Sequence, residues 1–206
     1  MNFKKIGFVL IAMTISSCEP TNTIQVFDHA EQYEIEKPII ENYLNTHYYD
    51  NIDHEIKDLD ANQVALSDDA NLQVLSDTIN DVVYEMYSYV YEQGSQDYPD
   101  QDDTVNISYS LSALDGTFYE EIEKDNNFIS LLSVISGWRI GLVVFRGGVS
   151  SETDSSIPRQ YSETGKGFMI IPSGLGYQNI GKGFVGPNET LVFKINLKTV
   201  VSVGDD

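Results

Sequence analysis

Cysteine, histidine and basic residues are all scarce in this chain, and each shortage excludes a class of structure or chemistry. Cys18 is the one cysteine, so no disulfide bond can form within the chain. None of the three histidines lies beyond residue 54, which excludes a Ser-His hydrolase site built within the C-terminal half. The 12 Lys and Arg residues face 32 Asp and Glu residues, for a formal net charge of -20. Such a chain repels nucleic acids and anionic lipid surfaces, so we predict no nucleic-acid partner.

A long apolar run is also lacking, except near the N-terminus. Lys4 and Lys5 precede an apolar stretch over residues 6–15, which is too short for a membrane-spanning helix of about 20 residues. This pattern predicts a secretory signal peptide over residues 1–18. Its ending, Ile-Ser-Ser-Cys, resembles the lipobox at which bacterial prolipoproteins are cut and acylated. The resemblance implies a lipid anchor on Cys18 and a location in the cell envelope. The alternatives are an ordinary signal peptide with an incidental cysteine, or a buried free thiol.

The acidic residues are concentrated in the first half of the chain. Residues 19–104 hold 21 Asp and Glu against Lys37 and Lys57, whereas residues 105–206 hold 11 acids and 8 Lys and Arg. We therefore predict an acidic N-terminal segment over residues 19–81, a domain over residues 82–202 and a tail over residues 203–206.

Two further patterns in the chain predict no site. His29, His47 and His54 lie among acids, but they show no compact ligand spacing, and residues 58–62 lack the Gly and the terminal Glu of a calcium loop. We predict no metal site. Residues 181–186 spell the Gly-x-Gly-x-x-Gly dinucleotide fingerprint, but they precede a predicted strand instead of opening a helix.

Apolar periodicity predicts the elements of both parts. In the acidic segment, residues spaced by three and four predict an amphipathic helix over roughly residues 37–47, with Pro38 in its first turn, and residues 50–80 are expected to be loop with one or two short elements. The later part reads as strands, one helix, then strands. We expect the strands at 82–91, 105–111, 167–171 and 191–201, a turn at 115–116 and a helix over 134–145. This order predicts an α+β domain in which an antiparallel sheet covers one helix.

Four segments, in order along the chain, carry a resemblance to a known family. They are Tyr109 to Glu120, which contains an Asp-Gly turn; Val134 to Leu142, with Val-Ile-x-Gly-Trp-x-x-Gly-Leu; Ile171 to Tyr177, with Ile-Pro-Ser-x-Leu-x-Tyr; and Val185 to Leu197. Together they resemble the FKBP-type peptidyl-prolyl cis-trans isomerases over about residues 82–202. The resemblance implies an FKBP-like antiparallel sheet wrapped around one short helix, preceded here by the small acidic segment.

The resemblance also implies roles for individual residues. Trp138 is expected beneath a substrate proline ring, and the Tyr177 hydroxyl is expected to donate to a substrate carbonyl. The other catalytic residues expected are Tyr109, Glu120 and Phe193, and the substrate-binding residues expected are Tyr119, Phe128, Val134, Ile135, Phe184 and Val185. Glu120 and Tyr119 depart from the family's usual Asp and Phe. The implied substrates are proline-containing polypeptides, and no cofactor is implied. The N-terminal segment is expected either to mediate a homodimer, as in some members of the family, or to serve as a spacer.

Alternatives remain open at this point. The large apolar residues of the motifs also suit a plain hydrophobic core. Residues 149–166 are a polar insert relative to the family and are expected to form a surface loop, which either selects clients or only decorates the pocket.

From the resemblance, we predict that the protein is a prolyl isomerase that assists the folding of exported proteins. The alternatives are a non-catalytic FKBP-like binding or chaperone lipoprotein, and a structural surface lipoprotein with a degenerate domain.

Overall fold

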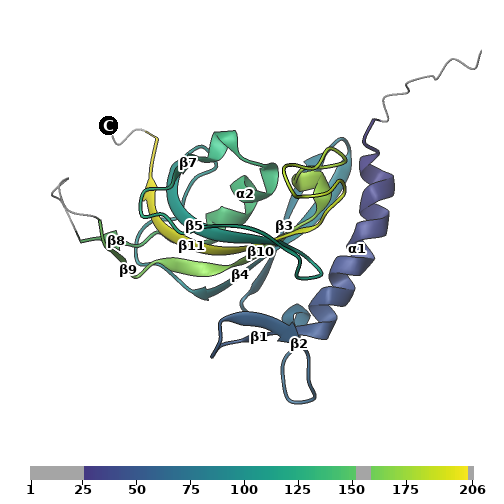
Figure 1. Cartoon of the computed structure of the whole chain (residues 1–206), viewed down its shortest axis with the longest axis horizontal. Helices are drawn as coiled ribbons and strands as arrows, with labels where there is room; N and C mark the ends of the chain where they lie inside the picture. Colours follow the sequence, from purple (N-terminus) through teal and green to yellow (C-terminus); the bar gives the residue numbers. More distant parts are fainter. Residues whose placement is uncertain (1–25, 152–158, 204–206) are drawn as a thin grey trace, which may run out of the picture.

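The computed structural model describes residues 26–151 and 159–203, and its centre is an antiparallel sheet that curls around a short helix (Figure 1). The strand order in this sheet is β3-β4-β10-β11-β5-β6, and β7 pairs with β5 beside β6. The helix, α2, spans Ser136–Gly141 and lies in the hollow of the sheet. The α+β class is confirmed. The strands are β3 Leu72–Ile79, β4 Val82–Glu92, β5 Thr104–Ala113, β6 Phe118–Ile122, β7 Phe128–Ser130, β10 Gly165–Ile171 and β11 Leu191–Val201.

Alternation along the strands gives the sheet two buried faces. In β11, the side chains of Phe193 and Ile195 point into the hollow with α2, while Val192, which precedes Phe193, points to the outer face. Sheets with one covered face usually show a polar second face. Here the outer face is partly covered as well, by the N-terminal helix, so the protein has one core inside the hollow and a smaller one outside it.

The N-terminal helix, α1, spans His29–Thr46 and packs its buried residues Ile40 and Leu44 against the outer face. Asp28 caps it by accepting a hydrogen bond from the Glu31 amide at 3.0 Å. The predicted start at residue 37 is wrong, and Pro38 lies inside the helix, not in its first turn. Proline removes one helical hydrogen bond. The helix continues through it because tertiary packing on both sides of the proline outweighs local propensity.

The stretch predicted as mostly loop, residues 50–80, contains more regular structure than expected. A hairpin joins β1, His47–Asp50, to β2, Glu55–Asp58, and a 3-10 turn over Leu66–Asp68 follows. Next, β3 pairs along its whole length with β4. The central sheet therefore begins at Leu72, and the predicted boundary at residue 82 falls within a hairpin of that sheet.

Two other expectations differ in detail from the structure. The helix predicted over residues 134–145 is split into α2 and a 3-10 turn over Leu142–Val144. Part of the insert forms a short hairpin of β8, Val149–Ser150, and β9, Tyr161–Ser162, and its last residues already belong to β10. Within the described residues, 26–151 and 159–203, no helix is long and apolar enough to cross a membrane. Cys18 lies outside the described residues.

Candidate functional site

A cavity of about 450 Å³ opens at the hollow face of the sheet, beside α2. Its walls come from β5, β7, the approach to α2, α2 itself, β11 and the loop that connects β10 to β11. Six of the residues predicted for the site line it together: Tyr109, Val134, Ile135, Trp138, Tyr177 and Phe193. Segments that are far apart in the sequence therefore meet at one place.

Three aromatic rings form the base of this cavity. The Trp138 ring stands edge-to-face against Tyr109, at 5.0 Å and 89°, and against Phe193, at 5.2 Å and 86°. Tyr109 and Phe193 contact each other at 5.8 Å and 62°. Aromatic pairs favour this geometry because the positive ring edge meets the negative face of its neighbour. Mutual contact fixes the three rings and leaves a rigid apolar surface towards the opening.

Glycines in α2 explain why Trp138 sits so deep, with only 4% of its surface exposed. A Cβ atom on Gly137 would lie 2.3 Å from Cγ2 of Ile171, and one on Gly141 would lie 2.4 Å from the sulfur of Met169. Both positions need glycine because the helix rests directly on β10. This close approach lowers α2 into the hollow and brings the Trp138 indole beneath the cavity.

Tyr177 comes from the loop after β10. A 3-10 turn, Ser173–Leu175, starts this loop and is closed by a hydrogen bond from the Gly176 amide to the Ser173 carbonyl at 2.9 Å. The Lys182 ammonium lies over the Tyr177 ring, 5.3 Å from its centroid. Burial, followed by the nearby Glu120 carboxylate, raises the pKa of Tyr177. The phenol therefore stays protonated at physiological pH and remains a hydrogen-bond donor.

Glu120 does not line the cavity, but its carboxylate influences both Tyr109 and Tyr177. The Tyr109 hydroxyl donates a hydrogen bond to Oε1 of Glu120 at 3.1 Å. Burial and this carboxylate raise the pKa of Tyr109. Glu120 lies in β6, where it stands opposite Leu111 of β5. The register of the β5–β6 pair thus sets the position of the carboxylate at the rim.

The other predicted residues lie around the cavity without lining it. Tyr119 packs against the inner core, and burial, followed by Glu189, raises its pKa. Val185 is buried and forms a small turn with Lys182, in which each amide donates to the other residue's carbonyl at 3.0 Å. Phe128 and Phe184 are 43% and 90% exposed. Their expected roles as pocket walls have no direct contact to support them.

Three lining residues were missed by sequence reasoning, namely Ile129, Ser133 and Lys182. Ile129 follows Phe128 in β7, so the alternation of the strand decides which of the two faces the cavity. The sequence gives no sign of which one it is. Lys182, whose ammonium lies over the Tyr177 ring, stands between Gly181 and Gly183, which have left-handed φ angles of 67° and 63°. That turn geometry leaves no specific trace in the residue pattern.

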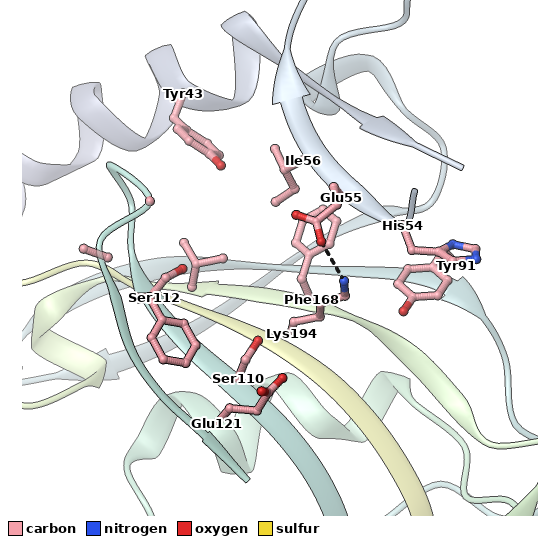
Figure 2. A pocket seen from close by; sticks show the side chains of 14 residues that line it. Tyr43, His54, Glu55, Ile56, Tyr91, Ser110, Ser112, Glu121, Phe168 and Lys194 are labelled. Atoms are coloured by element: carbon pink, nitrogen blue, oxygen red, sulfur yellow. Dashed lines mark hydrogen bonds and ion pairs between the residues drawn. The ribbon is translucent and has the colours of Figure 1, made fainter. Parts of the chain in front are cut away.

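A second cavity, of about 410 Å³, lies on the opposite, outer face of the sheet (Figure 2). Tyr43 of α1 and Ile56 of β2 face Phe168 of β10 across it, and a 3.3 Å ion pair between Lys194 and Glu55 spans it. None of the residues predicted for the site lines this cavity. In the described part of the chain, no group of three His, Cys, Asp or Glu side chains is arranged to hold a metal ion.

The chain is similar in sequence to known proteins. The model of the family "FKBP-type peptidyl-prolyl cis-trans isomerase" matches residues 95–198. The outer membrane protein MIP of Legionella longbeachae is 30% identical over 115 residues, which cover 54% of this chain and 42% of that protein. A probable FKBP-type isomerase, FkpA, of Neisseria meningitidis is 30% identical over 111 residues, with 52% and 35% covered. The chain thus spans less than half the length of these relatives.

Two solved structures are also similar. A peptidyl-prolyl cis-trans isomerase of Pseudomonas syringae superposes with a TM-score of 0.49 at 23% identity and covers 65% of this chain and 84% of its own. FkpA of Escherichia coli gives a TM-score of 0.44 at 27% identity, with 61% and 51% covered.

Proposed function

The chain belongs to the family of FKBP-type peptidyl-prolyl cis-trans isomerases, and on this premise we propose that it catalyses rotation about X-Pro peptide bonds in exported polypeptides. One observation carries the proposal. The cavity above Trp138, Tyr109 and Phe193 is floored by rigid apolar rings and opens beside a protonated phenol, that of Tyr177. A proline ring fits such a floor, and the phenol is placed to contact the neighbouring amide. No cofactor takes part in the proposed reaction.

The chemistry needs only a change of environment. Rotation about a peptide bond is opposed by a barrier of about 18–20 kcal/mol, because resonance gives the C–N bond partial double-bond character. That resonance separates charge between oxygen and nitrogen. An apolar surrounding disfavours the separated charge, which weakens the double-bond character and favours the twisted amide over the planar one. Selective stabilisation of the twisted form lowers the barrier without proton transfer or a covalent intermediate.

Two hydroxyl groups have different roles in this proposal. The Tyr109 hydroxyl is engaged by Glu120, so this pair holds the Tyr109 ring upright against Trp138. The Tyr177 hydroxyl donates to the carbonyl of the substrate. A hydrogen bond of this kind orients the substrate, so that the proline ring and not another side chain meets the indole of Trp138.

The test uses the chain from Glu19 onward, which contains every described residue, and short X-Pro peptides. We expect the wild type to accelerate isomerisation. Loss of one hydrogen bond in Tyr177→Phe lowers kcat/KM roughly tenfold, which corresponds to about 1.4 kcal/mol. Trp138→Ala lowers it further. Tyr98→Phe is the control, because Tyr98 lies outside the cavity, is 50% exposed and keeps its ring over Arg146. A well-folded wild type that gives no acceleration excludes catalysis.

One observation favours a second candidate function, the binding of unfolded segments without catalysis. Large apolar side chains are exposed on the segments that supply the cavity's walls: Phe184 90%, Ile180 84%, Leu132 67% and Phe128 43%. Exposed apolar groups of this kind are typical of surfaces that contact other proteins. Suppression of the aggregation of an unfolded client, by a chain that accelerates no X-Pro isomerisation, would support this chaperone function.

We also propose that the protein acts at the cell envelope, held by a lipid on Cys18. The support is the signal-like N-terminus with its Ser-Ser-Cys ending, together with the Legionella relative, which is named an outer membrane protein.

A homodimer could form through α1. This helix offers Ile35 and Ile39, which are 56% and 55% exposed, whereas Ile40 is buried within its own chain. Sedimentation of the wild type and of Ile39→Glu measures whether this face joins two copies.

A further inference from the structure

A buried glutamate in the N-terminal helix contacts the loop that carries Tyr177. Glu36 lies in α1, outside the residues that match the family, and only 3% of its surface is exposed. Acidic side chains are almost never buried this deeply without strong partners. Its carboxylate accepts hydrogen bonds from the Ser173 amide at 2.7 Å, from the Ser173 hydroxyl at 2.8 Å and from the Thr190 hydroxyl. Three neutral donors therefore converge on one carboxylate.

These donors stand at the two ends of one loop. Ser173 begins the 3-10 turn that follows β10, and Thr190 directly precedes β11. Between them lie Tyr177 and Lys182, which line the cavity. Glu36 thus ties the start of the loop to its end, in addition to the pairing of β10 with β11.

Backbone hydrogen bonds extend this tie towards Tyr177. The Gln178 amide donates to the Ser173 carbonyl at 3.0 Å, and the Asn188 amide donates to the Gln178 carbonyl at 2.7 Å. The residue that follows Tyr177 is therefore linked to both arms of the loop. A displacement of Ser173 is passed on to Tyr177 through one intervening hydrogen bond.

A second contact, which Tyr84 of β4 relays from the N-terminal helix, supports the same loop. The ring of Tyr84 lies so close to Gly174 that a Cβ atom there would be 2.2 Å from Cζ of the tyrosine. The hydroxyl of Tyr84 is in turn hydrogen-bonded to Nδ1 of His29, at the start of α1, at 2.7 Å. Adjacent residues of the turn, Ser173 and Gly174, are thus held from the same helix, directly and through Tyr84.

We propose that Glu36 is a positioning residue of the isomerase, which holds the loop from Ser173 to Thr190 so that the Tyr177 hydroxyl faces the substrate. The inference rests on the proposed function. A donor on a loose loop reaches its acceptor only part of the time, and misplacement by about 1 Å can lower a rate as much as 100-fold. The N-terminal segment is then a working part of the enzyme, although it lies outside the residues that define the family.

The main test is a double-mutant cycle measured as kcat/KM on X-Pro peptides, with the chain from Glu19 onward. Glu36→Ala removes the acceptor and is expected to lower kcat/KM roughly tenfold, the loss that about 1.4 kcal/mol gives. In the Tyr177→Phe background the same change is expected to have less than about a twofold effect, because the hydroxyl it positions is already gone. The proposal is overturned if Glu36→Ala lowers kcat/KM by the same factor in the wild-type and Tyr177→Phe backgrounds, or if it lowers kcat/KM in neither.

Conservative variants separate positioning from a general loss of stability. Glu36→Gln keeps an oxygen for the Ser173 amide and the Thr190 hydroxyl, and its amide group can donate to the Ser173 hydroxyl. It is expected to retain activity within about threefold of wild type. Glu34→Ala, on the exposed side of the same helix, is the matched control and is expected to have no effect. If Glu36→Ala does not fold, Thr190→Val removes one donor and is expected to lower kcat/KM at least about twofold.

Amide hydrogen exchange makes the outcome independent of catalysis. In Glu36→Ala, the amides from Ser173 to Thr190 are expected to exchange faster while those of β5 keep their protection. A wild type without activity refutes the proposed function, and the exchange pattern then decides whether Glu36 holds the loop. Unchanged exchange across the loop in Glu36→Ala refutes the holding role, whatever the activity.

Discussion

The contact between α2 and β10 makes Gly137→Ala the most demanding test of the structure. The new Cβ atom would lie 2.3 Å from Cγ2 and 2.9 Å from Cδ1 of Ile171. Carbon atoms normally stay about 3.5–4.0 Å apart, so one partner must shift by more than an ångström. Ile171 is completely buried, so its side chain cannot turn outward into solvent. The helix must therefore rise out of the hollow, and Trp138 must move with it.

The expected energy follows from two opposing effects. Overpacking of a close-packed core costs about 1–3 kcal/mol. Alanine is a better helix former than glycine by roughly 0.5–1 kcal/mol, and this gain is smaller near the start of a helix of six residues. We expect a net destabilisation of about 1–2 kcal/mol. For a chain of this size each kcal/mol lowers Tm by about 2–4 °C.

Trp138 is the only tryptophan, so its fluorescence reports on unfolding and on the site together. Thermal and urea unfolding of Gly137→Ala are compared with those of Ser136→Ala, a change at the neighbouring helical position that adds no atom. The glycine variant is expected to lose at least about threefold in kcat/KM as well. A Gly137→Ala protein as stable and as active as wild type would refute the close approach of α2 to Ile171.

Two predictions concern the N-terminal part of the chain. Burial raises the pKa of Glu36, so the folded state binds a proton more tightly than the unfolded chain, and this stabilisation is lost as pH rises through the raised pKa. The free energy of unfolding of the wild type, relative to that of Glu36→Gln, is therefore expected to fall as pH rises from about 4 and then to level off. Urea unfolding of both proteins at several pH values measures this difference. A difference that grows with pH contradicts the prediction. In cells, Cys18→Ser is expected to abolish labelling by a fatty-acid analogue and to release the protein from membranes, whereas unchanged labelling would exclude a lipid on Cys18.

The motif-bearing segments were the predictable part of the protein. The residues around Trp138, Tyr177 and Phe193 were assigned to one pocket from sequence, and the structure brings them to one cavity. These positions were predictable because the four motifs that carry them resemble those of the family in residue type and in order. The rim was less predictable. Phe128 and Phe184 differ from their lining neighbours only in which way a strand or a turn directs them, and an apolar side chain carries no sign of that direction.

The N-terminal segment shows why other features were not predictable. Glu36 reads as one more surface acid among several, because its donors are Ser173 and Thr190, far away in the sequence. The first turns of α1 were missed for the same reason, since polar side chains that are buried by distant partners break the apolar period. In β3, Leu72 and Ile79 flank Ser and Asp residues, as is usual for an edge strand with an exposed side. Because its apolar and polar residues alternate over so short a stretch, its sequence is hard to distinguish from that of a loop.

The order of strands in the sheet has a consequence for when the protein can fold. The two central strands, β10 and β11, come after all the other strands in the described part of the chain, and they separate β4 from β5. Until residue 201 has been synthesised, the β3–β4 hairpin and the β5–β6 hairpin have no shared partner, and each leaves a strand edge unpaired. Contacts this distant in sequence also close slowly. The hollow core can therefore be completed only once β10 and β11 have been made, so the two early hairpins must wait for the strands that join them.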